Sequence, residues 1–172
     1  MKELSRIPEL HPSQRGWFAE ALRQEMEENP RIVLVTGDLG YKMLDKIRDQ
    51  FPERVVNVGA AEQTMLGVAV GLAMHRAIPV VYSITNFLLY RGFETIRNYI
   101  DHEQIPVKLI GGGRDKDYAH DGYSHWSEDA KKIMDAAFPN IVQVWPETKE
   151  QIPDMLKEVL TNGKPTFVSL RR

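Results

Sequence analysis

Apolar and polar residues alternate along the chain in a pattern that switches repeatedly between helix-like and strand-like periods. Residues 13–28 have a helical period, in which Ser13 can cap the helix and Asn29-Pro30 end it. Further helices are predicted at 41–50, 62–75, 87–100, 127–137 and 149–161. One face of the first helix carries the apolar side chains Trp17, Phe18, Ala21, Leu22 and Met26.

Short apolar runs between these helices predict strands at 32–35, 55–58, 79–82, 107–110, 141–144 and 166–170. Strands that alternate with helices are typical of right-handed crossovers and a parallel sheet covered on both faces. We therefore expect an α/β protein with three α/β/α layers and a mostly parallel sheet of about six strands. No repeat, low-complexity tract or linker divides the chain, so we expect one domain over residues 1–172, with residues 1–12 as a flexible N-terminal segment.

Composition and charge exclude several classes of protein. The balance of 22 Lys+Arg against 24 Asp+Glu argues against a nucleic-acid binder that neutralises phosphates. Cysteine is absent, which excludes disulfides and thiolate chemistry. No apolar run reaches the roughly 18 residues of a membrane span, and the N-terminus lacks the apolar stretch of a signal peptide. We expect a cytoplasmic protein that acts on a small molecule, without nucleic-acid or membrane partners.

The candidate site lies where the predicted strands end, because ligands of open α/β sheets bind outside the carboxyl ends of the strands. Glu62 follows such a strand and begins a helix after a turn of glycine and alanine. It is either a first-turn acid that complements the helix dipole or a partly buried carboxyl that donates and accepts a proton. Asp38 lies in the turn after the first strand, where ordinary turn chemistry also explains it.

Aromatic side chains follow the third predicted strand at a spacing of three. Phe87, Tyr90 and Phe93 would share one helical face, which either packs into the core or stacks on a flat heterocycle.

Residues 111–125 are polar, lack a period and contain three successive glycines. These glycines could cradle a phosphate, although they match neither the Walker nor the dinucleotide pattern. No helical ligand spacing supports a metal site, so we expect none. A solvated surface loop is the alternative to a site that holds a polar or phosphorylated substrate through Arg114, Lys116, His120, Asp121 and His125.

Residues 58–73, which include Glu62, resemble the pyrimidine-binding domain of transketolase and of 1-deoxy-xylulose-5-phosphate synthase, and the similarity runs from about Ser13 to Arg172. Both enzymes use thiamine diphosphate. The resemblance implies that Glu62 is catalytic: it hydrogen-bonds N1′ of the cofactor's aminopyrimidine and favours the imino tautomer that deprotonates the thiazolium. This role fits a carboxyl that is buried at a helix start.

The same resemblance assigns roles to the other candidates. Phe87, Tyr90 and Phe93 match the aromatic positions that wall the aminopyrimidine pocket, and Asp38 matches, more loosely, an acidic turn near the cofactor. Residues 121–125 resemble the motif Asp-Gly-x-Thr-His, whose Asp and His contact substrate hydroxyls. Arg114 and Arg172 match arginines near a substrate phosphate, and Asp121 and His125 are the motif residues.

The sequence also departs from the family pattern. Gly113 stands where transketolases carry a histidine, Ser124 replaces the usual Thr, and Trp126 replaces the usual Gln. These changes bear on sugar-phosphate specificity.

The family's Gly-Asp-Gly motif, which binds the cofactor diphosphate through Mg²⁺, does not occur in these residues, and neither does the third domain of transketolases. We therefore expect a subunit of a split enzyme, in which a separately encoded partner binds the diphosphate and Mg²⁺ in an α₂β₂ assembly. The expected reaction transfers a two-carbon ketol unit between sugar phosphates. A deoxysugar synthase, a 2-oxo-acid decarboxylase and a non-catalytic degenerate module remain alternatives.

Overall fold

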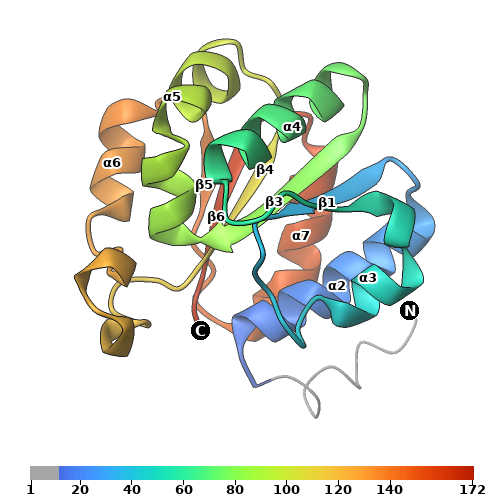
Figure 1. The fold of residues 1–172 in the computed structure, drawn as a ribbon, viewed down its shortest axis with the longest axis horizontal. Coiled ribbons are helices and arrows are strands. Elements are labelled where there is room, and N and C mark those ends of the chain that lie inside the picture. Colours follow the sequence, from blue (N-terminus) through green and yellow to red (C-terminus); the bar gives the residue numbers. More distant parts are fainter. Residues whose placement is uncertain (1–11) are drawn as a thin grey trace.

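A single six-stranded sheet organises the molecule (Figure 1). The computed structural model describes residues 12–172. The strand order is β2-β1-β3-β4-β6-β5, and every neighbouring pair is parallel. The expected three-layer α/β fold is therefore confirmed, with a sheet that is parallel throughout. The strands are β1 (Ile32–Thr36), β2 (Val55–Asn57), β3 (Ile78–Ile84), β4 (Lys108–Gly112), β5 (Val142–Val144) and β6 (Thr166–Leu170).

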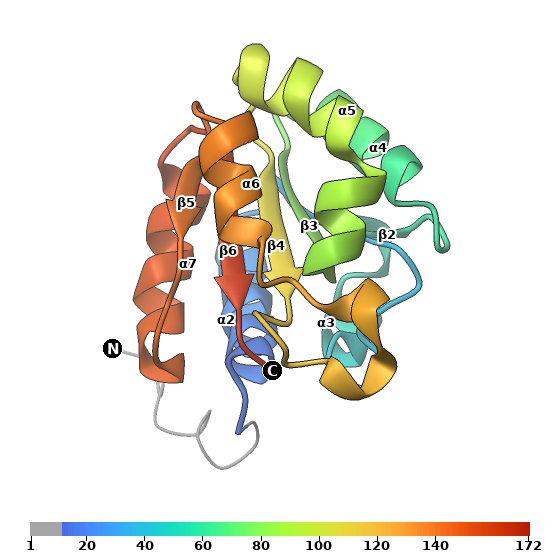
Figure 2. The same cartoon turned by 90° about the vertical axis from the view of Figure 1, so that its left-hand side faces the viewer.

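Helices cover both faces of the sheet, as the two views show (Figures 1 and 2). Successive strand residues point to opposite faces, so Leu34 belongs to one apolar core and Val35 to the other. The first core packs under α2 (Gln14–Glu28), α3 (Asp45–Gln50) and α7 (Ile152–Thr161). The second packs under α4 (Glu62–Met74), α5 (Phe93–Thr95) and α6 (Ala130–Ala137).

Some element boundaries differ from the predicted ones. Ser13 caps α2 by accepting a hydrogen bond from the Gly16 N–H, as predicted. The helix expected from residue 41 begins only at Asp45, because Lys42 adopts a positive φ of 62° that interrupts a helix. The expected flexible segment lies almost wholly outside the described residues.

The helix expected at 87–100 contains two π-helical turns, at Phe87–Arg91 and Ile96–His102, on either side of α5. A π-turn bonds i to i+5, so residues three apart no longer share a face. Gly92 ends the first π-turn, where a Cβ would lie 2.0 Å from Cδ1 of Leu66 on α4. Close packing against α4 therefore requires glycine here.

Among residues 12–172, no helix combines the length and the apolar character that crossing a membrane requires.

Candidate functional site

The carboxyl ends of the parallel strands meet at one edge of the sheet, and the predicted site residues follow them. Glu62 follows β2, Phe87 follows β3, and His125 lies in the segment after β4. This edge carries two clusters of side chains, one around Phe87 and one around Tyr118.

Glu62 begins α4 and is buried, with a side chain only 2% exposed. Arg91 forms an ion pair with Glu62: Nη1 of Arg91 donates to Oε1 of Glu62 at 2.9 Å and to Oε2 at 3.0 Å. The positive end of the α4 dipole also favours a carboxylate at this position. Glu62 is therefore a buried acid whose charge is balanced by a neighbouring side chain and by the helix.

Phe87 is the aromatic centre of the first cluster. The guanidinium carbon of Arg91 lies 3.8 Å from the ring centroid of Phe87, which is a close cation–π contact. The imidazole of His125 packs edge-on against the same ring, with centroids 4.9 Å apart. The structure thus brings Glu62, Phe87 and His125 together, with Arg91 between the acid and the ring.

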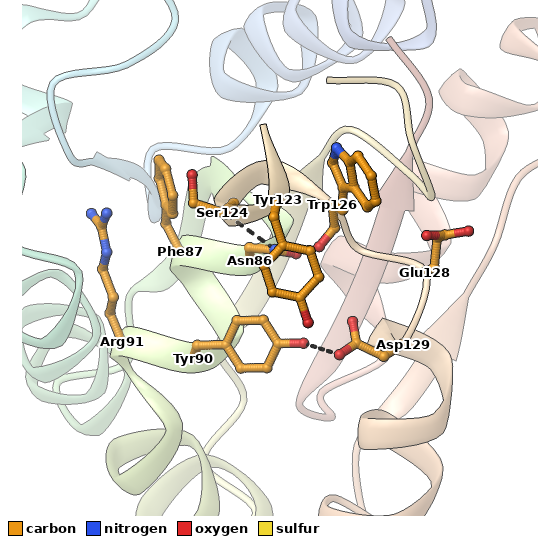
Figure 3. A pocket seen from close by; sticks show the side chains of 9 residues that line it. All are labelled: Asn86, Phe87, Tyr90, Arg91, Tyr123, Ser124, Trp126, Glu128 and Asp129. Atoms are coloured by element: carbon orange, nitrogen blue, oxygen red, sulfur yellow. Dashed lines mark hydrogen bonds between the residues drawn. The ribbon is translucent and has the colours of Figure 1, made fainter. Parts of the chain in front are cut away.

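A cavity of about 650 Å³ opens beside Phe87 (Figure 3). At its far end the Tyr90 hydroxyl donates to Oδ2 of Asp129 at 2.5 Å. Partial burial and this hydrogen bond raise the pKa of the Tyr90 phenol well above its ordinary value. The cavity has room for a ring-sized ligand, and it is lined by Asn86, Phe87, Tyr90, Arg91, Tyr123, Ser124, Trp126, Glu128 and Asp129.

Phe93 lies elsewhere than the resemblance implied. Its ring packs against Phe138, with centroids 5.0 Å apart, and belongs to the core between α5 and α6. The π-turn at Phe87–Arg91 explains the difference, because it rotates Phe93 away from the face that carries Phe87 and Tyr90. Phe93 therefore supports the site from the core, which was the other interpretation of this aromatic pattern.

The second cluster surrounds the phenol of Tyr118. Nη1 of Arg15 donates to the Tyr118 hydroxyl at 2.5 Å, and the Arg172 guanidinium lies 5.2 Å from the ring centroid. His120 lies within 3.1 Å of Arg172, while His125 joins the two clusters with its ring 6.3 Å from that of Tyr118. Two arginines and a histidine around one phenol suit an anionic group.

Asp121 and Asp38 are exposed at the same edge. Oδ2 of Asp121 lies 3.2 Å from Nε2 of His120, so the aspartate reaches the Tyr118 cluster. Asp38 adopts a positive φ of 59°, and its N–H donates to Oδ1 of Asn57 at 2.9 Å. Asp38 thus has the turn geometry that was its simpler explanation.

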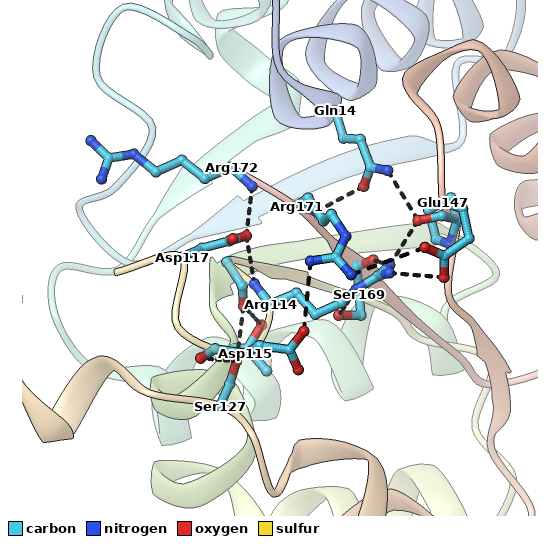
Figure 4. Close-up of polar contacts among 12 residues, drawn as sticks. Gln14, Arg114, Asp115, Asp117, Ser127, Glu147, Ser169, Arg171 and Arg172 are labelled. Carbon is cyan, nitrogen blue, oxygen red and sulfur yellow. Dashed lines mark hydrogen bonds and ion pairs between the residues drawn. The ribbon is translucent and has the colours of Figure 1, made fainter. Parts of the chain in front are cut away.

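Arg114 faces the interior, although the resemblance placed it near a substrate phosphate (Figure 4). The residue is 5% exposed, and Nη2 donates to the carbonyls of Pro146 at 2.9 Å and Ser169 at 2.5 Å. Burial lowers the pKa of this guanidinium, and Glu147 pairs with it at 3.3 Å. Its donors tie β6 to the segment after β5, and in this conformation they bind the protein itself.

The three glycines do not form a phosphate cradle. Gly111 and Gly112 lie inside β4, paired with β3 and β6. A Cβ on Gly112 would lie 2.6 Å from the Tyr82 hydroxyl, and one on Gly113 would lie 2.2 Å from the Tyr118 ring. Glycine is therefore required for close packing at this edge. In residues 12–172, no group of three or more His, Asp or Glu side chains is arranged to hold a metal ion.

Sequence reasoning missed three residues of the site: Arg91, Arg15 and Tyr118. Only Arg15 gave a signal, because a cation in the first turn of a helix opposes the helix dipole. Arg91 pairs with an acid 29 residues away, and no local pattern indicates such a contact.

Comparison with known proteins supports the resemblance. Residues 11–172 match the family model described as the transketolase pyrimidine-binding domain. The chain is 28% identical over 164 residues to a putative transketolase C-terminal section from Methanocaldococcus jannaschii, covering 95% of the chain and 52% of that protein. It is 34% identical over 155 residues to 1-deoxy-D-xylulose-5-phosphate synthase from Anaeromyxobacter, covering 86% of the chain and 23% of that enzyme.

A solved structure agrees with both relatives. The protein described as a split gene transketolase, inactive beta4 tetramer, matches with a TM-score of 0.82 at 29% identity, over 93% of the chain and 51% of its own length. The chain thus spans only about half of this structure and of the Methanocaldococcus relative, and less of the synthase. Fold, sequence and family model agree that the chain belongs to the transketolase pyrimidine-binding domain family.

Proposed function

We propose that residues 1–172 form one pyrimidine-binding domain that holds the aminopyrimidine half of thiamine diphosphate in a transketolase-like enzyme. The observation that carries this proposal is the buried Glu62 carboxylate beside the ring of Phe87. The planar guanidinium of Arg91 lies between them and donates N–H to the carboxylate. A carboxylate that accepts an N–H bond and an aromatic face that stacks are what an aminopyrimidine needs. The residues present therefore fit this half of the cofactor.

The chain's own residues divide the work at the site. When bound, thiamine diphosphate supplies the carbanion chemistry that moves a two-carbon ketol unit. Glu62 exchanges a proton with the pyrimidine nitrogen, and Phe87 orients the ring by stacking. The aromatic wall continues along the cavity with Tyr90.

The substrate lies on the other side of His125, toward the Tyr118 cluster. His125 and Asp121 hydrogen-bond the hydroxyls of a sugar, and Arg172 with Arg15 binds an anionic end such as a phosphate. This assignment is supported by the 6.3 Å separation of the His125 and Tyr118 rings, which makes the two clusters continuous. Arg114 has no part in it, because its donors are bound to main-chain carbonyls.

A second subunit completes the site in this proposal. In this proposal, a separately encoded diphosphate-binding subunit binds the diphosphate and Mg²⁺. Two relatives support a divided enzyme by their descriptions, one as a C-terminal section and one as a split gene transketolase. Self-association within an α₂β₂ assembly is supported by the description of the split gene transketolase as a tetramer.

A deoxysugar synthase remains the second candidate. It is favoured by the 34% identity to 1-deoxy-D-xylulose-5-phosphate synthase. Assays of the assembled enzyme with pyruvate and with ketose phosphates as donors separate the two reactions.

The Glu62→Gln variant tests the proposed function. We expect it to lower turnover of the assembled enzyme by about 10²–10⁴-fold, because it removes the proton exchange while keeping the shape of the side chain. Assembly with the partner, measured by size-exclusion chromatography, stays intact. Glu94→Gln, the same change at an exposed position of α5, is the control and keeps full turnover. Unchanged turnover in Glu62→Gln would refute the catalytic assignment.

A further inference from the structure

We propose that, in the unassembled subunit, the Arg91 guanidinium occupies the position at which the flat ring of the ligand binds. The ligand then displaces the guanidinium from between Glu62 and Phe87. The inference rests on the proposed function, since that function places an aminopyrimidine at this position. It assigns to Arg91 a role that the sequence pattern did not reveal.

The Arg91 guanidinium makes the contacts that we expect of the aminopyrimidine ring. Its guanidinium is planar, presents N–H to both oxygens of Glu62 at 2.9 and 3.0 Å, and lies over the Phe87 ring at 3.8 Å. An aminopyrimidine uses the same two contacts, an edge toward the acid and a face toward the aromatic ring. Both groups cannot make these contacts at once, so the ligand and the guanidinium compete.

A stand-in is needed because Glu62 is buried. A carboxylate that is 2% exposed and lacks a partner would be costly for the folded subunit, and Arg91 supplies the partner. Arg91 itself lines the cavity beside Phe87 (Figure 3). The empty subunit therefore keeps its acid paired until a ligand replaces the arginine.

Arg91 is also able to leave. Its side chain is 48% exposed, and both of its hydrogen bonds within the described residues go to the one acid. Loss of the pair would be costly if Glu62 stayed unpaired, but a ligand that replaces the guanidinium keeps the acid paired. The long, flexible stem lets the guanidinium move into solvent without a change in the backbone.

The first test observes Arg91 directly in the purified chain of residues 1–172. In ¹⁵N-labelled protein, the Arg91 Nη–H signal, assigned by its loss in Arg91→Met, should be shifted by the Phe87 ring and should exchange slowly with water, because Nη1 donates to both oxygens of Glu62. The Arg97 signal, from an exposed residue of the same helical segment, serves as the reference. Addition of 4-amino-5-hydroxymethyl-2-methylpyrimidine, the cofactor's ring alone, should move the Arg91 signal toward that of Arg97. An Arg91 signal that already equals Arg97 in the free chain would overturn the inference.

The second test measures the affinity for the same pyrimidine by NMR titration. Arg91→Met should bind it about tenfold more tightly than the natural chain, because the competitor is gone. Arg97→Met, which deletes the same charge nearby, should bind as the natural chain does. Arg91→Lys keeps a charged partner for Glu62 but cannot stack as a plane, so it should fall between the two and guards against a folding defect in Arg91→Met.

Two failures are distinguishable. If the natural chain binds the pyrimidine but Arg91→Met binds it equally or more weakly, Arg91 is no competitor, and the proposed function survives. Binding of the pyrimidine to neither the natural chain nor Arg91→Met would overturn this inference alone, because the proposed function is tested in the assembled enzyme. If the pyrimidine binds the natural chain and Glu62→Gln with equal affinity, the ring does not sit on Glu62. The proposed function then fails, and this inference fails with it.

Discussion

The imidazole of His125 packs edge-on against the ring of Phe87, with centroids 4.9 Å apart and the ring planes at 66°. The two residues come from segments after β4 and β3, and sequence reasoning gave them separate roles in substrate and cofactor binding. Their contact means that a sugar held by His125 would lie directly beside a ring stacked on Phe87. The proposed cofactor site and the proposed substrate site are therefore adjacent, and the contact between Phe87 and His125 joins them.

Loss of His125 should affect substrate and leave cofactor binding intact. We expect His125→Ala to lower kcat/KM for a ketose phosphate by about 10–100-fold in the assembled enzyme, as one hydrogen bond from a charged or polar group is lost. His102→Ala, at the exposed last residue of the second π-turn, is the control. Steady-state kinetics checks this, and an equal loss of thiamine diphosphate affinity would assign His125 to the cofactor instead.

Substitution of the two arginines that the resemblance assigned to a phosphate, Arg114 and Arg172, should have different effects on the free energy of unfolding. Arg114→Met leaves the carbonyls of Pro146 and Ser169 without their donor, so the free energy of unfolding should fall by about 2–4 kcal/mol. Arg172→Met removes an exposed guanidinium and should change it by less than about 0.5 kcal/mol, while weakening the binding of a phosphorylated substrate. Urea unfolding measures both. An Arg114→Met chain of natural stability would contradict the structural role of Arg114.

Gly92 should be intolerant of even one added carbon. A Cβ there would lie 2.0 Å from Leu66 Cδ1 and 3.1 Å from the Leu88 carbonyl, so Gly92→Ala should cost about 1–3 kcal/mol of unfolding free energy. Gly67→Ala is the matched control on α4, where an added Cβ meets nothing within 4 Å. That change should stabilise the isolated chain by about 0.5–1 kcal/mol through helix propensity. Thermal and urea unfolding of both variants checks the contrast, which disappears if α4 and the π-turn are not packed as described.

Lys108 should give the stability of the chain a particular pH dependence. Its side chain is buried at the start of β4, and burial lowers its pKa to about 8 from the ordinary lysine value of 10.5. Below pH 8 both states carry the proton. Between about pH 8 and 10 the unfolded chain still binds a proton that the folded chain has released, so the free energy of unfolding rises with pH, by up to about 3 kcal/mol.

The trend should reverse at higher pH. Burial raises the pKa of Tyr82 to about 12, so above pH 10 the unfolded chain loses this phenol proton first and stability falls. Urea unfolding from pH 7 to 11 measures the curve. Lys108→Met should remove the rise between pH 8 and 10, and a rise that persists in this variant would assign it to another group.

Much of the fold follows from local pattern. The alternation of short apolar runs with helical periods predicts all six strands, because a parallel sheet buried on both faces needs such runs. Ser13 was recognisable as a cap because capping depends on one residue and its immediate neighbours. The π-turn at Phe87–Arg91 was not, since it depends on how Gly92 meets Leu66 on another helix.

The location of the candidate site was predictable from the sequence, but several of its residues and most of its contacts were not. Glu62 and Phe87 were found because both stand at strand ends, where the topology concentrates ligand contacts. The resemblance alone assigned Phe93 to the cofactor pocket and Arg114 to a substrate phosphate. In the structure, Phe93 packs against Phe138, and Arg114 donates to a main-chain carbonyl. Arg91 could not be found, because its two partners meet it only in the folded chain.

The central claim is that this chain holds one half of thiamine diphosphate and that a partner subunit holds the other. Calorimetric titration of thiamine diphosphate with Mg²⁺ tests it, first into the purified chain and then into its mixture with a diphosphate-binding subunit encoded nearby. We predict tight binding in the mixture and none at the same concentrations in the chain alone, with Glu62→Gln weakening the binding in the mixture. Tight binding to the chain alone would contradict the divided site, and absence of binding in a mixture shown by chromatography to assemble would contradict the cofactor assignment.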